Sequence, residues 1–277
     1  MSHFVLHVFT PAPPNGENNL ISHPMMDKIM DRYDENREVE PYVDSFVPFE
    51  EAQDLRDKHG PGESVGDFIA AWYGGDEVRW SSDRNGYEVI TTSNPESKWD
   101  WWVAGGRWEG GLIVKGGEGV DATQVKNLAW DDHIAELITE ANKRYDKFQE
   151  VTAGIDVPPS YRQLLEVGQD PTTARANYLS EPWVQAARSL DPLSMLTPHA
   201  EYHVGKGGRD SYVYQETGVD VPHAWIDLEG EWHERGEMGW FGVFDKEKEF
   251  AEHVSAYRAY RDSLPGDTYI TLIDCHI

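Results

Sequence analysis

DTYITLIDCHI, residues 267–277, is an almost unbroken run of β-branched and apolar residues. Such a run is typical of a buried strand. SHFVLHVFT, residues 2–10, is a second run of this kind, and the turn-forming sequence PAPPNGENN follows it. An apolar strand left exposed would promote aggregation, so we expect the two strands to lie side by side in one sheet. Residues 1–277 would then form a single domain.

The chain between these strands alternates helical and strand patterns. HAWIDLEGEWHERG, residues 223–236, predicts a hairpin. Residues 150–198 hold several prolines and short helical pieces, and indicate an insertion packed on the main body. The whole predicts an α+β fold: a mixed or antiparallel sheet, possibly ferredoxin-like, with helices packed on it. Helices are predicted over 49–59, 65–73, 122–148 and 250–263, and strands over 86–92, 99–103 and 111–115, the last two paired.

The composition is strongly acidic. Asp and Glu number 50 against 24 Lys and Arg, a formal net charge of −26. This disfavours direct nucleic-acid binding, which needs basic patches, and fits a solvated acidic surface or a mimic of nucleic acid. The single cysteine, Cys275, excludes an intrachain disulfide and fits a reducing compartment. The N-terminus shows no signal-peptide pattern and no apolar run could span a membrane. We therefore expect a cytoplasmic protein, inside a host cell and not secreted.

One stretch, SKWDWWVAGGRWEGG at residues 97–111, carries four of the eleven tryptophans. In a strand, alternate side chains of this stretch would face the core and a ligand. The two glycines allow a sharp turn, and the arginine after them offers a planar set of donors for a carboxylate or phosphate. The alternative is an aromatic hairpin whose arginine pairs with an internal acid. The ligand-binding candidates here are Trp99, Asp100, Trp101, Arg107 and Trp108.

A second stretch, GEWHERGEMGWFG at residues 230–242, has the same ingredients. We expect it to converge with the first stretch on one pocket, adding Trp232, Arg235 and Trp240 as ligand-binding candidates. Glu234 and Glu237 are candidates for acid–base chemistry. The alternative is a tight turn in which these glutamates pair with arginines.

Asp274 and His276 lie two apart, so a strand places both on one face. A carboxylate can orient a histidine for catalysis, and the alternative is a plain hydrogen-bonded pair. Cys275 then faces the other way, into the core. His3 and His7 share one face of the first strand. If the terminal strands pair, one of these histidines could meet Asp274 or His276.

Four pieces of the chain resemble a family of uncharacterised proteins seen mainly in bacteriophage genomes, with relatives in bacteria. The pieces are MSHFVLHV, NPESKWDWWVAGGRW, GEWHERGEMGWFG and LPGDTYITLIDCHI. The chain departs from the family pattern at Trp102, Ala104 and Phe241, where Tyr, Ile and Trp are usual, and it is not matched over about 150–215. The resemblance implies a phage or prophage origin and the importance of these motifs, but no reaction.

These observations together predict a phage-type accessory protein that binds a small anionic, nucleotide-like ligand in an aromatic pocket lined by Arg and Glu. If the ligand is transformed, hydrolysis or group transfer is expected. The alternatives are an acidic interaction module that inhibits a host enzyme, and a virion structural component. The sequence has no P-loop, HExxH or GxSxG pattern and assigns no metal or cofactor. The catalytic candidates are Glu234, Glu237, Asp274 and His276.

Overall fold

The structure, a computed structural model, describes residues 3–11, 23–60, 64–190, 200–238, 244–245 and 250–277. Its largest sheet has the strand order β5-β11-β1-β7-β8, with β6 also paired to β11. The prediction that the terminal strands are neighbours is confirmed, because β1 and β11 pair antiparallel from His3↔His276 to Thr10↔Tyr269. The strands are β1 (His3–Thr10), β5 (Trp101–Ala104), β6 (Ala122–Gln124), β7 (Ala224–Ile226), β8 (Trp232–Glu234) and β11 (Tyr269–His276).

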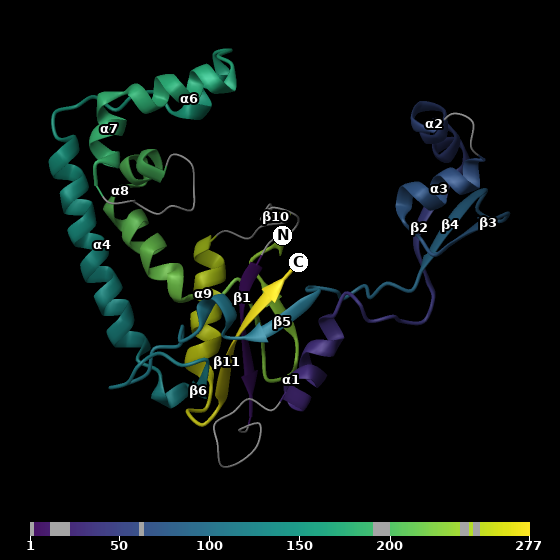
Figure 1. Cartoon of the computed structure of the whole chain (residues 1–277), viewed down its shortest axis with the longest axis horizontal. Coiled ribbons are helices and arrows are strands. Elements are labelled where there is room, and N and C mark those ends of the chain that lie inside the picture. The colour runs from purple at the N-terminus through teal and green to yellow at the C-terminus, as the bar shows by residue number, and fades with distance from the viewer. Residues whose placement is uncertain (1–2, 12–22, 61–63, 191–199, 239–243, 246–249) are drawn as a thin grey trace.

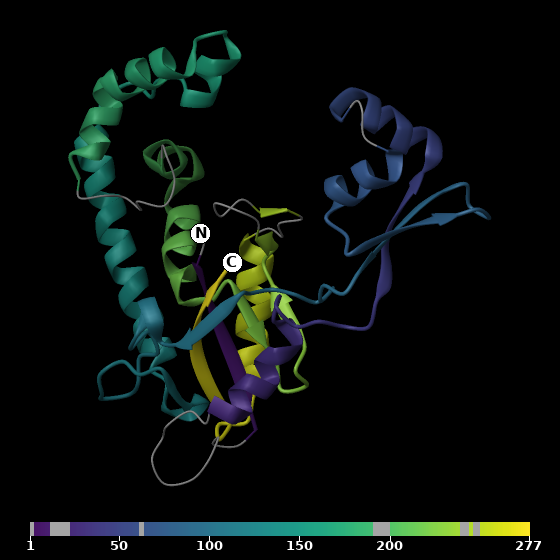
Figure 2. The ribbon, with the colours of Figure 1, turned by 45° about the vertical axis from the view of Figure 1, so that its right-hand side comes forward.

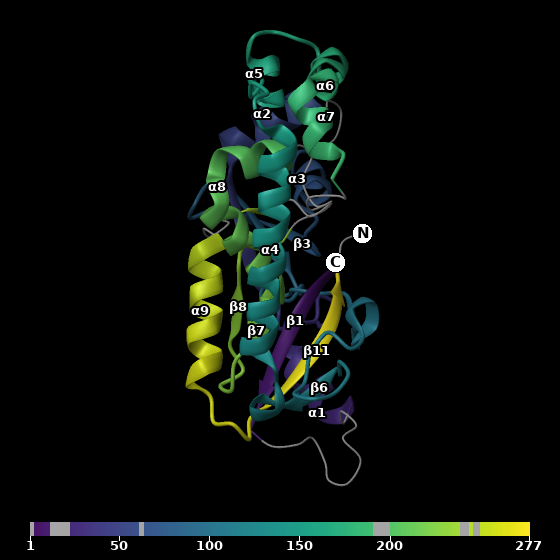
Figure 3. The same cartoon turned by 90° about the vertical axis from the view of Figure 1, so that its left-hand side faces the viewer.

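Each face of this sheet is covered by a helix. Helices α1 (His23–Met30) and η1 (Asp31–Tyr33) lie against one face, whose core includes Leu6 and Cys275. Helix α9 (Phe250–Ser263) lies against the other and buries Tyr257 between Phe9 and Trp225. Figures 1 and 3 show α1 and α9 on opposite sides of β1 and β11. Successive side chains of β1 point to opposite faces of the sheet, so this one strand contributes residues to the cores under both helices.

The α+β class is confirmed, and several local predictions agree with the structure. The 223–236 hairpin is β7–β8, and the predicted helix 250–263 is α9. The ferredoxin-like option is wrong, because such a sheet separates its first two parallel strands, whereas β1 and β7 pair directly. The pairing of 99–103 with 111–115 is also wrong: β5 pairs with β11, and the later segment makes only isolated bridges.

Residues 42–91 form a small lobe with a sheet and a core of their own. The sheet has the order β2-β4-β3. Its core holds Val47, Ala52, Phe68, Ile69 and Val89. Figures 1 and 2 show the lobe standing away from the main sheet on two connecting segments. The single-domain prediction for 1–277 did not include this second core. The elements are β2 (Tyr42–Pro48), α2 (Phe49–His59), α3 (Val65–Tyr73), β3 (Glu77–Ser81) and β4 (Gly86–Thr91).

A helical arm extends from the main sheet on the other side (Figures 1 and 2). Helices α4, α7 and α8 share its core, which centres on Tyr145, Phe148 and Trp183. The insertion expected over 150–198 corresponds to α5–α7, of which α7 packs on α4 and α8, while 191–198 lie outside the described residues. Helix α4 begins later than predicted, because 122–124 form β6. The helices are α4 (Trp130–Thr152), α5 (Tyr161–Glu166), α6 (Pro171–Ser180), α7 (Pro182–Arg188) and α8 (Ala200–Thr217, interrupted at Gly208).

The remaining short elements connect these parts. They are η2 (Gly106–Trp108), η3 (Val125–Asn127), η4 (Gly218–Asp220), and the two-stranded pair β9 (Glu237–Met238) and β10 (Phe244–Asp245). The first end of β1 and the last end of β11 lie side by side between the lobe and the arm (Figure 2). That place matters because both strand ends carry histidine.

Candidate functional site

The paired ends of β1, β11 and β5 gather two histidines and two carboxylates on one face of the sheet. His3 Nδ1 lies 2.8 Å from Asp274 Oδ1. His276 Nδ1 lies 2.6 Å from Asp100 Oδ1. The two imidazole rings meet edge to face, with centroids 4.8 Å apart. We call these four side chains the two-histidine site.

Aromatic surface adjoins the two imidazoles. Trp101 pairs in register with His276 across β5 and β11, and its indole stacks on that ring at 5.2 Å and 16°. The edge of His3 meets the same indole at 5.2 Å. Trp101 is still 43% exposed, whereas the side chains of His3 and His276 are 9% and 8% exposed. The site is thus sheltered yet open on the tryptophan side.

The GGR turn explains how a buried carboxylate is held. Gly105 and Gly106 both have positive φ, at +70° and +56°. A Cβ on Gly106 would lie 2.5 Å from Asp274 Cβ, so only glycine lets the backbone come this close. The turn then aims the Arg107 backbone N–H at Asp274 Oδ2, 3.1 Å away. Asp274 thereby accepts from His3 with one oxygen and from the turn with the other.

The segment before the lobe brings Asn36 and Glu35 close to Asp100 of the two-histidine site. Asn36 Nδ2 donates to the Asp100 carbonyl at 3.1 Å. Partial burial, and then the charges of Asp100 and Asp34, raise the pKa of Glu35, while His276 opposes that shift. Glu35 therefore lies within electrostatic reach of the two-histidine site. No local pattern points to Glu35, because its position depends on the bridge between Asp34 and Trp99.

This arrangement can move protons. A carboxylate on Nδ1 fixes the orientation of an imidazole and stabilises the imidazolium formed during a reaction. In the part of the chain that the structure describes, nothing hydrogen-bonds to Nε2 of His3 or His276. Each ring therefore keeps one nitrogen for a substrate. Burial raises the pKa of the Cys275 thiol, with Asp274 adding to the shift, so this buried cysteine on the opposite face is a core residue and no nucleophile.

Arg107 and Trp108 follow the turn directly. The Arg107 side chain is exposed and forms no ion pair with any described residue. Trp108 packs partly buried against the α9 side of the sheet and lines a neighbouring cavity. Trp108 is therefore on the same face as the two-histidine site.

Trp99 differs from the sequence-based prediction. Trp99 and Trp101 were expected on one face of a strand, but β5 begins only at Trp101. Trp99 instead bridges to Asp34 and is buried in the α1-side core, where Trp102 also packs. The expected strand placement of Trp99 is therefore wrong and its side chain lies away from the two-histidine site, whereas Asp100 and Trp101 join that site.

The two tryptophan-rich stretches do not converge through Arg107 or Trp108, since β5 and β8 lie at opposite edges of the sheet. They meet instead at Lys98, whose Nζ donates to Glu234 Oε1 at 2.7 Å. The other Glu234 oxygen accepts from Trp232 Nε1 at 2.8 Å. Glu234 is thus an ion-pair partner of Lys98 and lies apart from Asp274 and His276, so the structure does not bring these catalytic candidates together.

The other residues of the second stretch are also accounted for. Trp232 packs on Tyr33 with ring centroids 5.0 Å apart, in the α1-side core. The Arg235 guanidinium lies 5.0 Å from the Phe250 ring. Among the described residues, neither Trp232 nor Arg235 reaches the two-histidine site or shares a pocket with Arg107. The Glu237 side chain and Trp240 lie outside the described residues.

His3 was foreseen only as a geometric option, and that option is confirmed by its bond to Asp274. Sequence reasoning missed His7, Trp130 and Asp220 as cavity residues, since they come from three distant segments. Over the described ranges, no cluster of three or more His, Cys, Asp or Glu has a geometry that could hold a metal ion.

Comparisons of the chain with protein-family models, with curated proteins and with solved structures find no match. The resemblance to phage proteins therefore stays a prediction that rests on the motifs. Searching the described helices for a membrane span finds none of sufficient length and apolarity.

Proposed function

We propose that the protein binds a small anionic, nucleotide-like ligand at the two-histidine site and hydrolyses a phosphoester bond in it. The observation that carries this proposal is the pair of imidazoles 4.8 Å apart, each with Nδ1 on a carboxylate. Hydrolysis of a phosphoester needs one group to take a proton and another to give one. Two imidazoles with free Nε2 atoms supply both.

The reaction balances with these two groups. The oxygen of a water molecule attacks phosphorus and forms a new P–O bond, while one neutral imidazole takes the water proton at Nε2. The bond from phosphorus to the leaving oxygen breaks, and the other ring, as imidazolium, gives its Nε2 proton to that oxygen. Solvent then returns both rings to their starting protonation.

The surroundings of the site support an anionic ligand with a planar ring. Arg107 is a cation without an ion-pair partner among the described residues, and guanidinium groups suit phosphate. Trp101 offers exposed indole beside the two imidazoles, and planar bases stack on such surfaces. The setting inside a phage-infected host is part of the proposal and is supported by the four motifs.

A panel of nucleoside monophosphates and of linear and cyclic phosphodiesters tests this function, with products followed by ³¹P NMR. We expect a bell-shaped pH dependence for the substrate that is cleaved, and a loss of about 10²–10⁴-fold in rate for His3→Gln and for His276→Gln. His233→Gln is the matched control, because His233 also bonds to a carboxylate, Asp227 Oδ2 at 2.7 Å, but on the β7–β8 hairpin.

Cleavage that survives both substitutions would remove the histidines from the mechanism. No cleavage and no binding across the panel would favour the interaction module instead. One observation fits that alternative: Trp72 and Trp80 on the lobe are 50% and 45% exposed, and tryptophan is enriched at the energetic centres of interfaces.

A further inference from the structure

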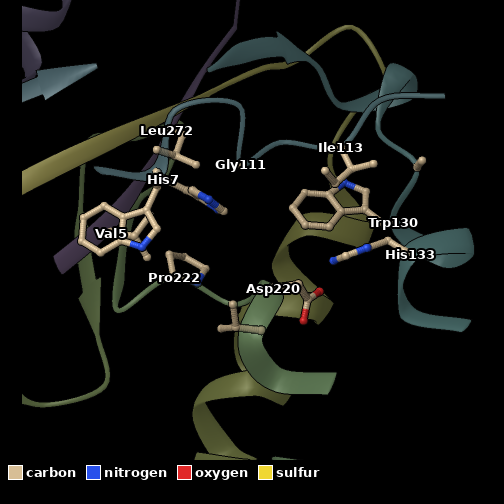
Figure 4. A pocket seen from close by; sticks show the side chains of 12 residues that line it. Val5, His7, Gly111, Ile113, Trp130, His133, Asp220, Pro222 and Leu272 are labelled. Carbon is tan, nitrogen blue, oxygen red and sulfur yellow. The ribbon is translucent and has the colours of Figure 1, made fainter. Parts of the chain in front are cut away.

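A second site lies on the same face of the sheet, nearer its middle. It is a cavity of about 140 Å³ between the sheet, η4 and the start of α4. Figure 4 shows His7, Trp130 and Asp220 turned toward this space from three different elements. The lining residues are Val5, His7, Trp108, Gly111, Ile113, Ala129, Trp130, His133, Asp220, Val221, Pro222 and Leu272.

His7 is the buried polar group of this cavity. It is 4% exposed, and its Nδ1 lies 2.6 Å from the Tyr257 hydroxyl. Burial lowers the pKa of His7 to about 3, so the ring is neutral at neutral pH. Among the described residues, no group bonds to its Nε2. That nitrogen donates or accepts according to which way the Tyr257 hydroxyl points.

Two further polar atoms of lining residues are buried without a hydrogen bond, Asp220 Oδ2 and Trp130 Nε1. Both atoms are closed off from solvent within the protein, so neither is available to a ligand in the cavity. The Asp220 charge is balanced, since Arg258 Nη2 donates to Oδ1 at 2.9 Å and Arg261 lies 3.8 Å from Oδ2. With Asp220 neutralised by the two arginines and His7 uncharged, the cavity suits a neutral molecule that offers one polar atom to His7 Nε2.

The size of the cavity limits the ligand to one ring. An engineered cavity of about 150 Å³ holds benzene, and this cavity is about 140 Å³. The centroids of His7 and Trp130 are 6.4 Å apart, too close for a ring between them, so they form one wall. Val5, Leu272 and Ile113 supply apolar surface. We infer that the cavity binds a single-ring nitrogen heterocycle of the pyrimidine class, held by His7 Nε2 against the wall that His7 and Trp130 form.

The cavity adjoins the two-histidine site, but the inference that it binds a ring does not depend on the proposed hydrolysis. Val5 pairs with Asp274, and Leu272 lies two residues before it, so the cavity begins where the two-histidine site ends. The ring therefore comes from one of two sources: a free pyrimidine, or the base of a nucleotide whose phosphate lies at the two-histidine site. Both can present the same N3–H and C=O groups to the cavity, whereas N1 carries a proton in the free base and the sugar in the nucleotide.

Binding of uracil to the whole protein tests the inference. Saturation-transfer NMR and the ¹⁵N shift of His7 Nε2 are followed during titration with uracil, with benzene as the apolar ring and adenine as the two-ring control. We expect uracil to bind and to move the His7 resonance, benzene and adenine not to bind, and His7→Phe to abolish uracil binding. Ala129→Leu, which fills the cavity, should weaken uracil at least 10-fold. Ala135→Leu is its matched control, because Ala135 is exposed on helix α4, which Ala129 directly precedes.

The outcomes separate the possibilities. Benzene binding as well as uracil, or no ring binding at all with water alone filling the cavity, would overturn the inference. The titration of the wild-type protein with uracil, benzene and adenine tests the inference even if a variant fails to fold. Uridine monophosphate distinguishes the sources: tighter binding than uracil that disappears in Arg107→Ala indicates a nucleotide, and no such gain indicates a free base. Uracil binding without any phosphoester cleavage would support the inference about the cavity and contradict only the proposed hydrolysis.

Discussion

At Arg107, the backbone and the side chain have different roles. The backbone N–H donates to Asp274, and any residue other than proline can do this. The guanidinium is exposed and has no ion-pair partner in the described part of the chain. The arginine of the GGRW sequence is therefore not needed to satisfy a buried acid, which was the alternative open at the sequence level.

Arg107→Ala should for this reason change the melting midpoint of the free protein by no more than about 2 °C, as for a surface substitution. The same change should abolish stabilisation by phosphate-bearing ligands. Thermal shift of wild type and variant, with and without a nucleotide panel, measures both. Collapse of the unliganded variant, with no response of the wild type to any nucleotide, would show that the arginine is structural.

Residue patterns predicted which face of the sheet a side chain is on better than they predicted which residues it contacts. The spacing of Asp274 and His276 gave their common face, and the facing of Cys275 into the core is also confirmed. Which acid each histidine meets depends on pairing between strands far apart in sequence. Asp100 reaches His276 because β5 is the outer neighbour of β11, and no local pattern specifies that edge.

At the scale of elements, the turn between β5 and η2 is the part that positions Asp274. Gly106→Ala places a Cβ 2.5 Å from Asp274 Cβ and 2.6 Å from its Oδ2, in addition to the left-handed backbone cost. The expected result is a loss of stability well above the roughly 1–2 kcal/mol of that backbone cost, together with loss of ligand response. Urea unfolding and the nucleotide thermal shift measure these two effects.

Gly116→Ala is the matched control for this turn. Gly116 has a similar φ of +64°, but nothing lies within 4 Å of an added Cβ. Its substitution should cost only the backbone term and leave ligand binding unchanged. Equal losses in the two variants would mean that contact with Asp274 is not what the glycine provides.

Elements with strong local patterns were predictable, and the rest were not. Helix α2 matches its predicted bounds 49–59, and α3 begins with Ser64 accepting from the Asp67 N–H at 3.1 Å, a local cap. By contrast, 111–115 has the residues of a strand but no free strand edge to pair with, because β5 and β6 already occupy the outer side of β11. Tertiary pairing overrides local propensity here.

At the scale of the molecule, the histidines lie at the meeting point of three bodies. The main sheet carries them, the lobe lies beyond the Glu35 side, and the helical arm extends from the opposite side (Figure 2). Every polar side chain of the two-histidine site comes from β1, β11 or the segment leading into β5. The site therefore depends on the integrity of the sheet, and above all on β11, which pairs with β1, β5 and β6.

Deleting residues 271–277 tests this dependence. It removes Thr271 to His276 from β11, all of them buried, and opens β1 and β5 along one edge. Burial of one large apolar side chain contributes about 1.5–3 kcal/mol. The free energy lost with Leu272, Ile273 and the hydrogen bonds of β11 is therefore a large part of a typical net stability of about 5–15 kcal/mol. We expect insoluble protein, because an exposed apolar edge strand pairs with other chains. Removing Ile277 alone, which lies beyond β11, should leave soluble protein, and soluble, cooperatively folding 1–270 would contradict the central place of β11.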